Sequence, residues 1–102
     1  MKVTNMKTTK GNTVPNQFII EDKGNTWFQS YQSIIALKPD LYGCENTINT
    51  NDPMRYKIQL DKNYWDYSAT TGRYRNEFLG EGIAVTRAKI DSGEYILTDL
   101  NS

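Results

Sequence analysis

Residues 18–29 read FIIEDKGNTWFQ, with two runs of β-forming residues on either side of a short polar stretch. The flanking runs, 18–21 and 26–29, contain Ile, Phe and Trp, which are enriched in strands. The polar stretch contains Gly24, which readily adopts the positive φ that a tight turn requires. Residues 18–29 therefore predict a β-hairpin.

The segments on either side of this hairpin continue the β pattern less clearly. Residues 1–14 are rich in Lys, Thr and Asn, which is typical of a flexible arm, with a short edge strand as the alternative. Residues 34–37 resume an apolar run after Ser30 and Tyr31. This pattern favours a bulge or corner at Ser30 and Tyr31, although a new strand that begins near Ser33 fits the same residues.

A long loop and a further strand are predicted next. Residues 38–54 contain Pro39, Gly43 and Pro53 among Asn, Thr and Asp, which is the composition of a loop. Such a loop is longer than most connections inside a compact domain. Residues 56–60 then alternate between apolar and polar types, which predicts a half-buried strand.

Two short helices follow this strand. The first is capped by Ser68 or Thr70 and ends at Gly80, and the second covers residues 83–91. Residues 94–98 predict a last strand. The fold class is therefore α+β: a small antiparallel sheet of three to five strands, with an N-terminal β-hairpin and two short helices between the last strands.

Length and composition set limits on function. The 102 residues suit a single domain, spanning residues 1–102. Twelve basic and twelve acidic residues balance, so the basic excess typical of nucleic-acid binders is absent. The sequence has no histidine, and Cys44 is its one cysteine. This excludes histidine-based nucleophile systems and multi-cysteine zinc sites. We predict a protein that is not an enzyme and uses no metal or cofactor, with an enzyme that acts through carboxylates or a bound metal as the alternative.

Glu77 and Glu81 flank Gly80, the expected helix end, and are expected to be solvated surface carboxylates.

Other features predict where the protein acts. No apolar run approaches the roughly 18–20 residues that span a bilayer. Residues 1–10 lack the apolar stretch of a signal peptide. A cytoplasmic location without membrane contact is therefore expected.

The most distinctive segment, residues 64–76, combines aromatic rings, hydroxyls at a helix start and two arginines. Aromatic residues and arginine are enriched at binding hot spots, and hydroxyls at a helix start suit an anion. The alternative is structural: the hydroxyls cap the helix, the rings fill the core and the arginines are solvated. The partner-binding candidates are Trp65, Tyr67, Thr70, Thr71, Arg73, Tyr74 and Arg75.

Two segments together resemble a family of small proteins encoded by phages and prophages. They are Ser30-Tyr31-Gln32-Ser33-Ile34-Ile35-Ala36 and Trp65-Asp66-Tyr67-Ser68-Ala69-Thr70-Thr71. The resemblance covers residues 15–37 and 56–99. It implies a phage context, in which small proteins block or redirect a host enzyme or occupy nucleic acid. The chain departs from the family at Tyr74, where many relatives carry His, and in the longer residues 38–55.

The expected function is that of a non-enzymatic phage accessory protein in the host cytosol that binds a macromolecule. The first expectation is a host or phage protein as partner, with inhibition of a host function as one outcome. The alternative is a nucleic acid, and a second copy could also pair through an exposed sheet edge. The phosphate-contacting residues would be Lys57, Arg73, Arg75, Arg87 and Lys89.

Overall fold

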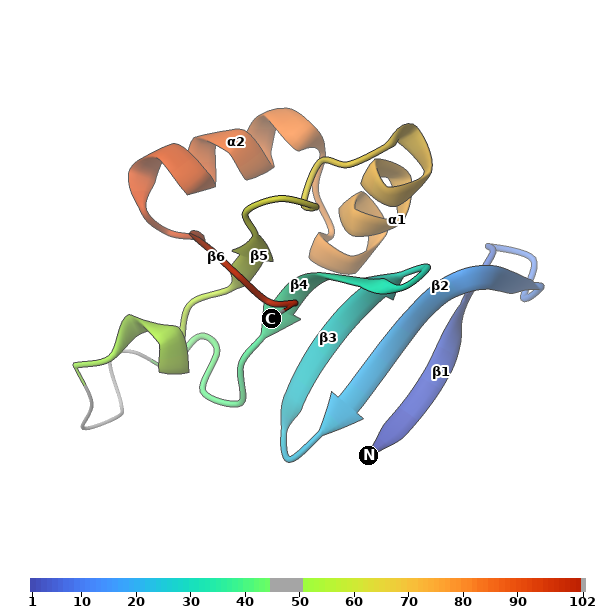
Figure 1. Cartoon of the computed structure of the whole chain (residues 1–102), viewed down its shortest axis with the longest axis horizontal. Helices are drawn as coiled ribbons and strands as arrows, with labels where there is room; N and C mark the ends of the chain where they lie inside the picture. The colour runs from blue at the N-terminus through green and yellow to red at the C-terminus, as the bar shows by residue number, and fades with distance from the viewer. Residues whose placement is uncertain (45–50, 102) are drawn as a thin grey trace.

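The computed structural model describes residues 1–44 and 51–101, and its core is one six-stranded sheet. The strands are β1 (Lys2–Lys7), β2 (Thr13–Asp22), β3 (Asn25–Ser30), β4 (Ser33–Lys38), β5 (Gln59–Asp61) and β6 (Ile96–Thr98), in that spatial order. A 3-10 helix, η1 (Pro53–Arg55), precedes β5, and helices α1 (Ala69–Leu79) and α2 (Ile83–Ser92) connect β5 to β6. Both helices lie on one face of the sheet (Figure 1).

The predicted α+β class, with its N-terminal hairpin and two helices between the last strands, is confirmed. The sheet differs from the prediction in size and direction. It has six strands, and β6 runs parallel to β5. A crossover connection is what allows two successive strands to pair in parallel, and α1 and α2 provide it here. The N-terminal residues add a further strand, because β1 pairs antiparallel with β2 in place of a flexible arm.

Both tight turns of the sheet use residues with positive φ. Lys23 (φ 53°) and Gly24 (φ 85°) join β2 to β3, as in the two-residue turns that match the strand twist. The next turn contains Tyr31, and Ser30 pairs directly with Ser33. The alternative of a new strand at Ser33 is therefore the correct one, and the favoured corner is wrong.

The segment between β4 and β5 follows the prediction only in part. Residues 45–50 of the predicted loop, 38–54, lie outside the described residues. The strand expected at 56–60 is shorter, because the N–H groups of Tyr56 and Lys57 donate to the carbonyl of Pro53 and close η1. Strand β5 therefore begins at Gln59.

The core fills the space between the sheet and α1. Phe28 of β3 stacks on Phe78 of α1, with ring centroids 5.8 Å apart and planes inclined by 30°. Ser68 accepts a hydrogen bond from the N–H of Thr71 and caps α1, and Gly80 (φ 72°) ends it. The predicted limits of α1 are thereby confirmed, and α1 is fixed over β3.

Glu81 is the point at which α1, α2 and the approach to β6 are tied together. Its carboxylate accepts hydrogen bonds from the Thr86 hydroxyl at 2.7 Å, the Lys89 ammonium at 2.8 Å and the Tyr95 hydroxyl at 2.8 Å. The side chain is only 9% exposed, so the expectation of a solvated carboxylate is wrong for Glu81. The left-handed Gly80 reverses the chain and directs the following residue onto α2.

These contacts shift the ionisation of the cluster. Burial raises the pKa of the Glu81 carboxyl, but the hydrogen bonds from Lys89, Thr86 and Tyr95 outweigh burial and leave that pKa below its ordinary value of 4.5. The hydrogen bond to Glu81 raises the pKa of Lys89 above its ordinary range. Burial, followed by the hydrogen bond to Glu81, raises the pKa of the Tyr95 hydroxyl. The pair Glu81 and Lys89 is therefore charged across the neutral range.

We predict that Glu81→Gln lowers the free energy of unfolding by about 2 kcal/mol at pH 7, because charge-assisted hydrogen bonds are lost. The carboxyl has a lower pKa folded than unfolded, so its contribution is full above about pH 4.5 and is lost as the pH falls further. Urea unfolding at pH 7, 5, 4 and 3 measures the difference in free energy of unfolding between the parent protein and the Glu81→Gln variant. Glu77→Gln, on the exposed side of α1, is the control with no expected change. If Glu81→Gln lowered the free energy of unfolding equally at pH 7 and pH 3, the stabilising role of the ionised Glu81 carboxylate would be contradicted.

Candidate functional site

A cavity of about 640 Å³ opens where the β3–β4 turn approaches the start of α1. Its volume is within the range of ligand pockets. The described residues that line it are Asn16, Phe18, Gln29, Ser30, Tyr31, Gln32, Ser33, Ile35, Tyr64, Tyr67 and Thr71. None of these eleven is an aspartate, glutamate, lysine or arginine, so the cavity is lined by rings, hydroxyls, amides and one aliphatic side chain, that of Ile35.

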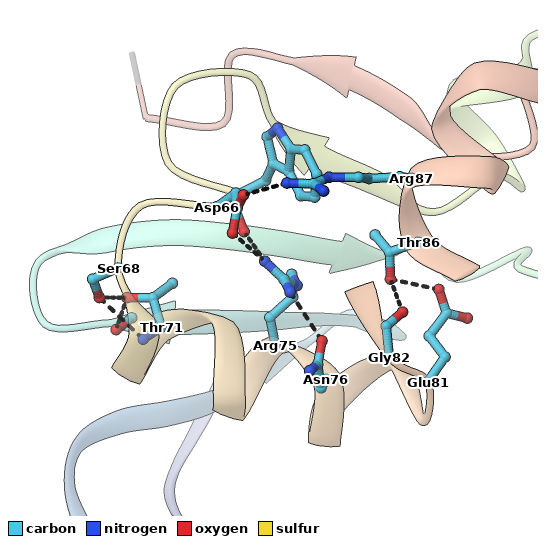
Figure 2. A network of polar contacts seen from close by, with 11 residues as sticks. Asp66, Ser68, Thr71, Arg75, Asn76, Glu81, Gly82, Thr86 and Arg87 are labelled. Atoms are coloured by element: carbon cyan, nitrogen blue, oxygen red, sulfur yellow. Dashed lines mark hydrogen bonds and ion pairs between the residues drawn. The ribbon is translucent and has the colours of Figure 1, made fainter. Parts of the chain in front are cut away.

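The inner part of the cavity is formed by side chains that are almost fully buried. Ser30 is 3% exposed, and Ile35 and Thr71 are each 1% exposed. The Ser30 and Thr71 hydroxyl oxygens lie 2.9 Å apart. The Ser68 hydroxyl donates to Thr71 Oγ1 at 3.2 Å, next to the capping bond that it accepts from the Thr71 N–H (Figure 2). A chain of three hydroxyls therefore joins β3 to the first turn of α1.

The outer part of the cavity carries exposed tyrosines. Tyr31 is 54% exposed and Tyr67 is 68% exposed. The rings of Tyr64 and Tyr67 meet edge to face, with centroids 5.5 Å apart. This is a favourable geometry for an aromatic pair. The rings of Tyr31 and Tyr67 are thus available at the entrance to a neutral cavity, and the Tyr67 ring packs against Tyr64.

The backbone at this entrance is held in an uncommon conformation. Asn16 (φ 65°) and Tyr31 (φ 57°) both have positive φ, and the Tyr31 N–H donates to the Asn16 carbonyl at 2.7 Å. Asparagine adopts such a conformation readily, whereas for tyrosine it costs about 1–3 kcal/mol, and strained residues of this kind cluster at functional sites. The β3–β4 turn requires a positive φ at this position, and glycine would adopt it with less strain than Tyr31.

Arg75 holds the segment that brings the tyrosines to the cavity. The guanidinium is 1% exposed, and its Nη1 donates to the Trp65 carbonyl at 2.7 Å and to Asp66 Oδ1 at 3.2 Å. Its Nη2 donates to Asn76 Oδ1 at 2.9 Å. Arg87 of α2 contacts the other oxygen of Asp66 at 3.3 Å (Figure 2). Residues 65–66 are therefore clamped between α1 and α2, immediately before Tyr67.

A second buried group fixes the other end of the same segment. The Asp61 carboxylate, fully buried, accepts hydrogen bonds from the backbone N–H groups of Asn63, Tyr64 and Leu100 at 2.8–3.0 Å. It thereby joins the turn after β5 to the chain that follows β6. Together, Asp61 and Arg75 determine where Tyr64 and Tyr67 lie.

The seven predicted binding residues fall into three groups. Tyr67 and Thr71 line the cavity. Trp65 and Arg75 are in the clamp, with the guanidinium carbon 5.4 Å from the Trp65 ring centre. Tyr74 belongs to the core, whereas Thr70 and Arg73 are exposed and lie outside the lining.

The sequence-based candidates omit the contribution of the first half of the chain. Ser30, Tyr31 and Ile35 line the cavity. For Trp27, Phe28 and Tyr31 of the hairpin, the sequence favours core packing, with a second partner-binding surface as the alternative. Of these three, Tyr31 is the one that lines the cavity. The structural alternative holds for the Ser68 cap and the solvated Arg73. It is wrong for Arg75, which is buried and bonded.

The residues predicted to contact phosphate are mostly engaged within the chain. Lys57 Nζ donates to the Gly93 carbonyl at 2.8 Å. Arg87 contacts Asp66, and Lys89 contacts both Glu81 and Glu94. With Arg75 buried, only Arg73 of this set is exposed without an acidic partner among the described residues.

We predict that Arg75→Lys lowers the free energy of unfolding by about 2–3 kcal/mol, because an ammonium cannot reproduce the forked contacts with Trp65 and Asp66. The same change should shift the ring resonances of Tyr64 and Tyr67. Chemical denaturation and NMR of the two proteins measure these effects. Arg73→Lys, two residues away and exposed, should remain within about 0.5 kcal/mol of the parent protein. Equal effects of the two substitutions would show that Arg75 does not act as a clamp.

Two further features concern the described part of the chain. None of its helices has the length and apolar character to cross a membrane. Residues 1–44 and 51–101 contain no cluster of three side chains suited to hold a metal ion.

Comparison with known proteins gives a family but no relative of known activity. No curated protein and no solved structure matches the chain. One family model matches residues 1–96, which include every described residue that lines the cavity. The chain belongs to this family, which is a family of unknown function (DUF8033).

Proposed function

We propose that this protein acts by binding rather than by catalysis, and that its partner is another protein, which docks over the cavity at the start of α1. The observation that carries the proposal is the composition of the lining. It has three tyrosines, Phe18 and Ile35 beside serine, threonine, asparagine and glutamine, and no charged side chain among its described residues. Tyrosine supplies rigid contact area at low entropic cost, and short polar residues supply adaptable hydrogen bonds. The same combination is typical of antibody paratopes.

The arrangement of the tyrosines supports a docking surface. Exposed aromatic rings beside a partly enclosed, desolvated pocket are the usual anchors of protein interfaces. Tyr31 and Tyr67 are both more than half exposed, and each is fixed by its own backbone contact or ring partner. A surface that is already ordered loses less conformational entropy when a partner binds.

The biological setting of the proposal comes from the family resemblance. Both segments that resemble phage and prophage proteins contribute to the cavity, through Ser30, Tyr31 and Ile35 on one side and Tyr67 and Thr71 on the other. We therefore place the protein as a phage accessory protein in the host cytosol. Its binding would block or redirect a host or phage protein.

A nucleic acid and a second copy are less well supported as partners. Nucleic-acid affinity depends on cations that are free to contact phosphate, and most of the basic candidates contact acids or carbonyls of this chain. Antiparallel pairing of two copies through β1 would place Lys2 of one copy near Lys7 of the other. Lysines on an edge strand oppose such pairing.

A photo-crosslinking amino acid at Tyr67 tests the proposal in the full-length protein, expressed in the cells in which its gene is found. We expect one discrete protein adduct, with its yield reduced about tenfold or more by Tyr31→Ala. The control position is Val85, which is 47% exposed on α2 and should give no such adduct.

Two outcomes would reject protein binding at this surface. One is an adduct of equal yield and identity from Tyr67 and Val85. The other is an adduct that disappears on nuclease treatment, because this would identify a nucleic acid as the ligand.

A further inference from the structure

The hydroxyls of Ser30 and Thr71 at the inner end of the cavity form a chain with the exposed Ser68 hydroxyl, and the three have one proton more than their mutual contacts use. Ser68 donates to Thr71 Oγ1, and one further contact joins Thr71 Oγ1 to Ser30 Oγ. These two contacts use two of the three hydroxyl protons. The third is on Ser30 or on Thr71, whichever of the two does not donate to the other. Within residues 1–44 and 51–101, neither oxygen has another hydrogen-bond partner.

The hydroxyl that carries this remaining proton is buried, and an unsatisfied donor is costly in a buried position. Ser30 is 3% exposed and Thr71 is 1% exposed, and a buried donor without an acceptor costs about 1–3 kcal/mol. Both residues line the cavity. An acceptor that enters the cavity can therefore recover this energy, and a carbonyl oxygen is the acceptor that proteins supply most often.

An unpartnered amide lies beside the same position. Gln17 is the direct cross-strand neighbour of Ser30, and its side chain is 1% exposed. Neither its Oε1 nor its Nε2 has a hydrogen-bond partner among the described residues. Gln17 itself is not among the residues that line the cavity, although Asn16 and Phe18, on either side of it in β2, are. Unsatisfied polar groups in buried positions are rare, and this cross-strand position has two of them, the Gln17 amide and the Ser30–Thr71 hydroxyl pair. Of the two, only the hydroxyl pair lines the cavity and can meet a polar ligand there.

The charge of the ligand follows from the lining. A carboxylate, phosphate or ammonium would lose its hydration without meeting an opposite charge, at considerable cost. A neutral carbonyl avoids this cost, and its partial negative charge suits the positive end of the α1 dipole. We infer that the group recognised in the cavity is an uncharged peptide amide, either an Asn or Gln side chain or a backbone amide. Its carbonyl accepts a hydrogen bond from the Ser30–Thr71 hydroxyl pair.

This inference rests on the proposed function, and it names the chemistry that the protein partner has to present. The probes are two capped tripeptides, acetyl-Gly-Asn-Gly-amide and acetyl-Gly-Asp-Gly-amide, titrated into the ¹⁵N-labelled full chain. We expect the Asn peptide to shift the amide signals of Ser30, Tyr31 and Thr71, with a dissociation constant of about 1 mM for so small a ligand. The Asp peptide should bind about tenfold more weakly.

A double variant, Ser30→Ala with Thr71→Val, removes both hydroxyls together. Replacing both partners of a hydrogen bond by apolar groups of similar shape is close to neutral for stability, so the variant should fold. It should bind the Asn peptide about tenfold more weakly than the parent protein. Thr70→Val changes the neighbouring exposed threonine and should leave the affinity unchanged.

Several results would overturn the inference. They are the absence of Asn-peptide binding, equal or tighter binding of the Asp peptide, tighter binding of methyl glucoside as a neutral hydroxyl ligand, and unchanged affinity in the folded double variant. The comparison of the two peptides needs no variant, so it decides the matter even if the double variant does not fold. Failure here with a protein adduct at Tyr67 rejects only the amide chemistry. Amide binding without any adduct rejects the protein partner and leaves the ligand site.

Discussion

The guanidinium of Arg75 is the group on which the geometry of the site depends. A buried cation depends on polar partners for its stability, and the two terminal nitrogens of Arg75 donate to the Trp65 carbonyl, Asp66 and Asn76. Its Nε has no hydrogen-bond partner among the described residues. These partners belong to one helix and to the segment before it. The contacts that compensate for the burial of the guanidinium therefore also fix the position of that segment. The segment leads directly into Tyr67, so the position of the Tyr67 ring at the cavity entrance depends on the ion pair between Arg75 and Asp66.

A second constraint acts from the sheet. The Asn16 carbonyl accepts the Tyr31 N–H, and both residues have positive φ. The pairing of β2 with β3 and of β3 with β4 supplies the free energy that keeps this conformation. The cavity is thus bounded by two independently fixed parts: a strained turn on the sheet and a clamped segment on the helices. The Ser30–Thr71 contact joins them.

Features that depend on near neighbours could be predicted from the sequence. The hairpin at residues 18–29 and both ends of α1 follow from local turn and capping chemistry. The parallel pairing of β6 with β5 could not, because it depends on how two helices return the chain to the sheet.

Burial of charged residues was the other feature that the sequence did not disclose. Arg and Glu are usually exposed, and only the acceptors and donors around Arg75 and Glu81 make their burial favourable. The cavity is hidden for a related reason, since Ser30 and Thr71 are 41 residues apart in the chain. The balance of twelve basic and twelve acidic residues then acquires a structural meaning. The ion pairs of Asp66 with Arg75 and Arg87 link α1 to α2. The described residues that line the cavity carry no charge, so a partner of the kind we propose would be recognised through shape and hydrogen bonds.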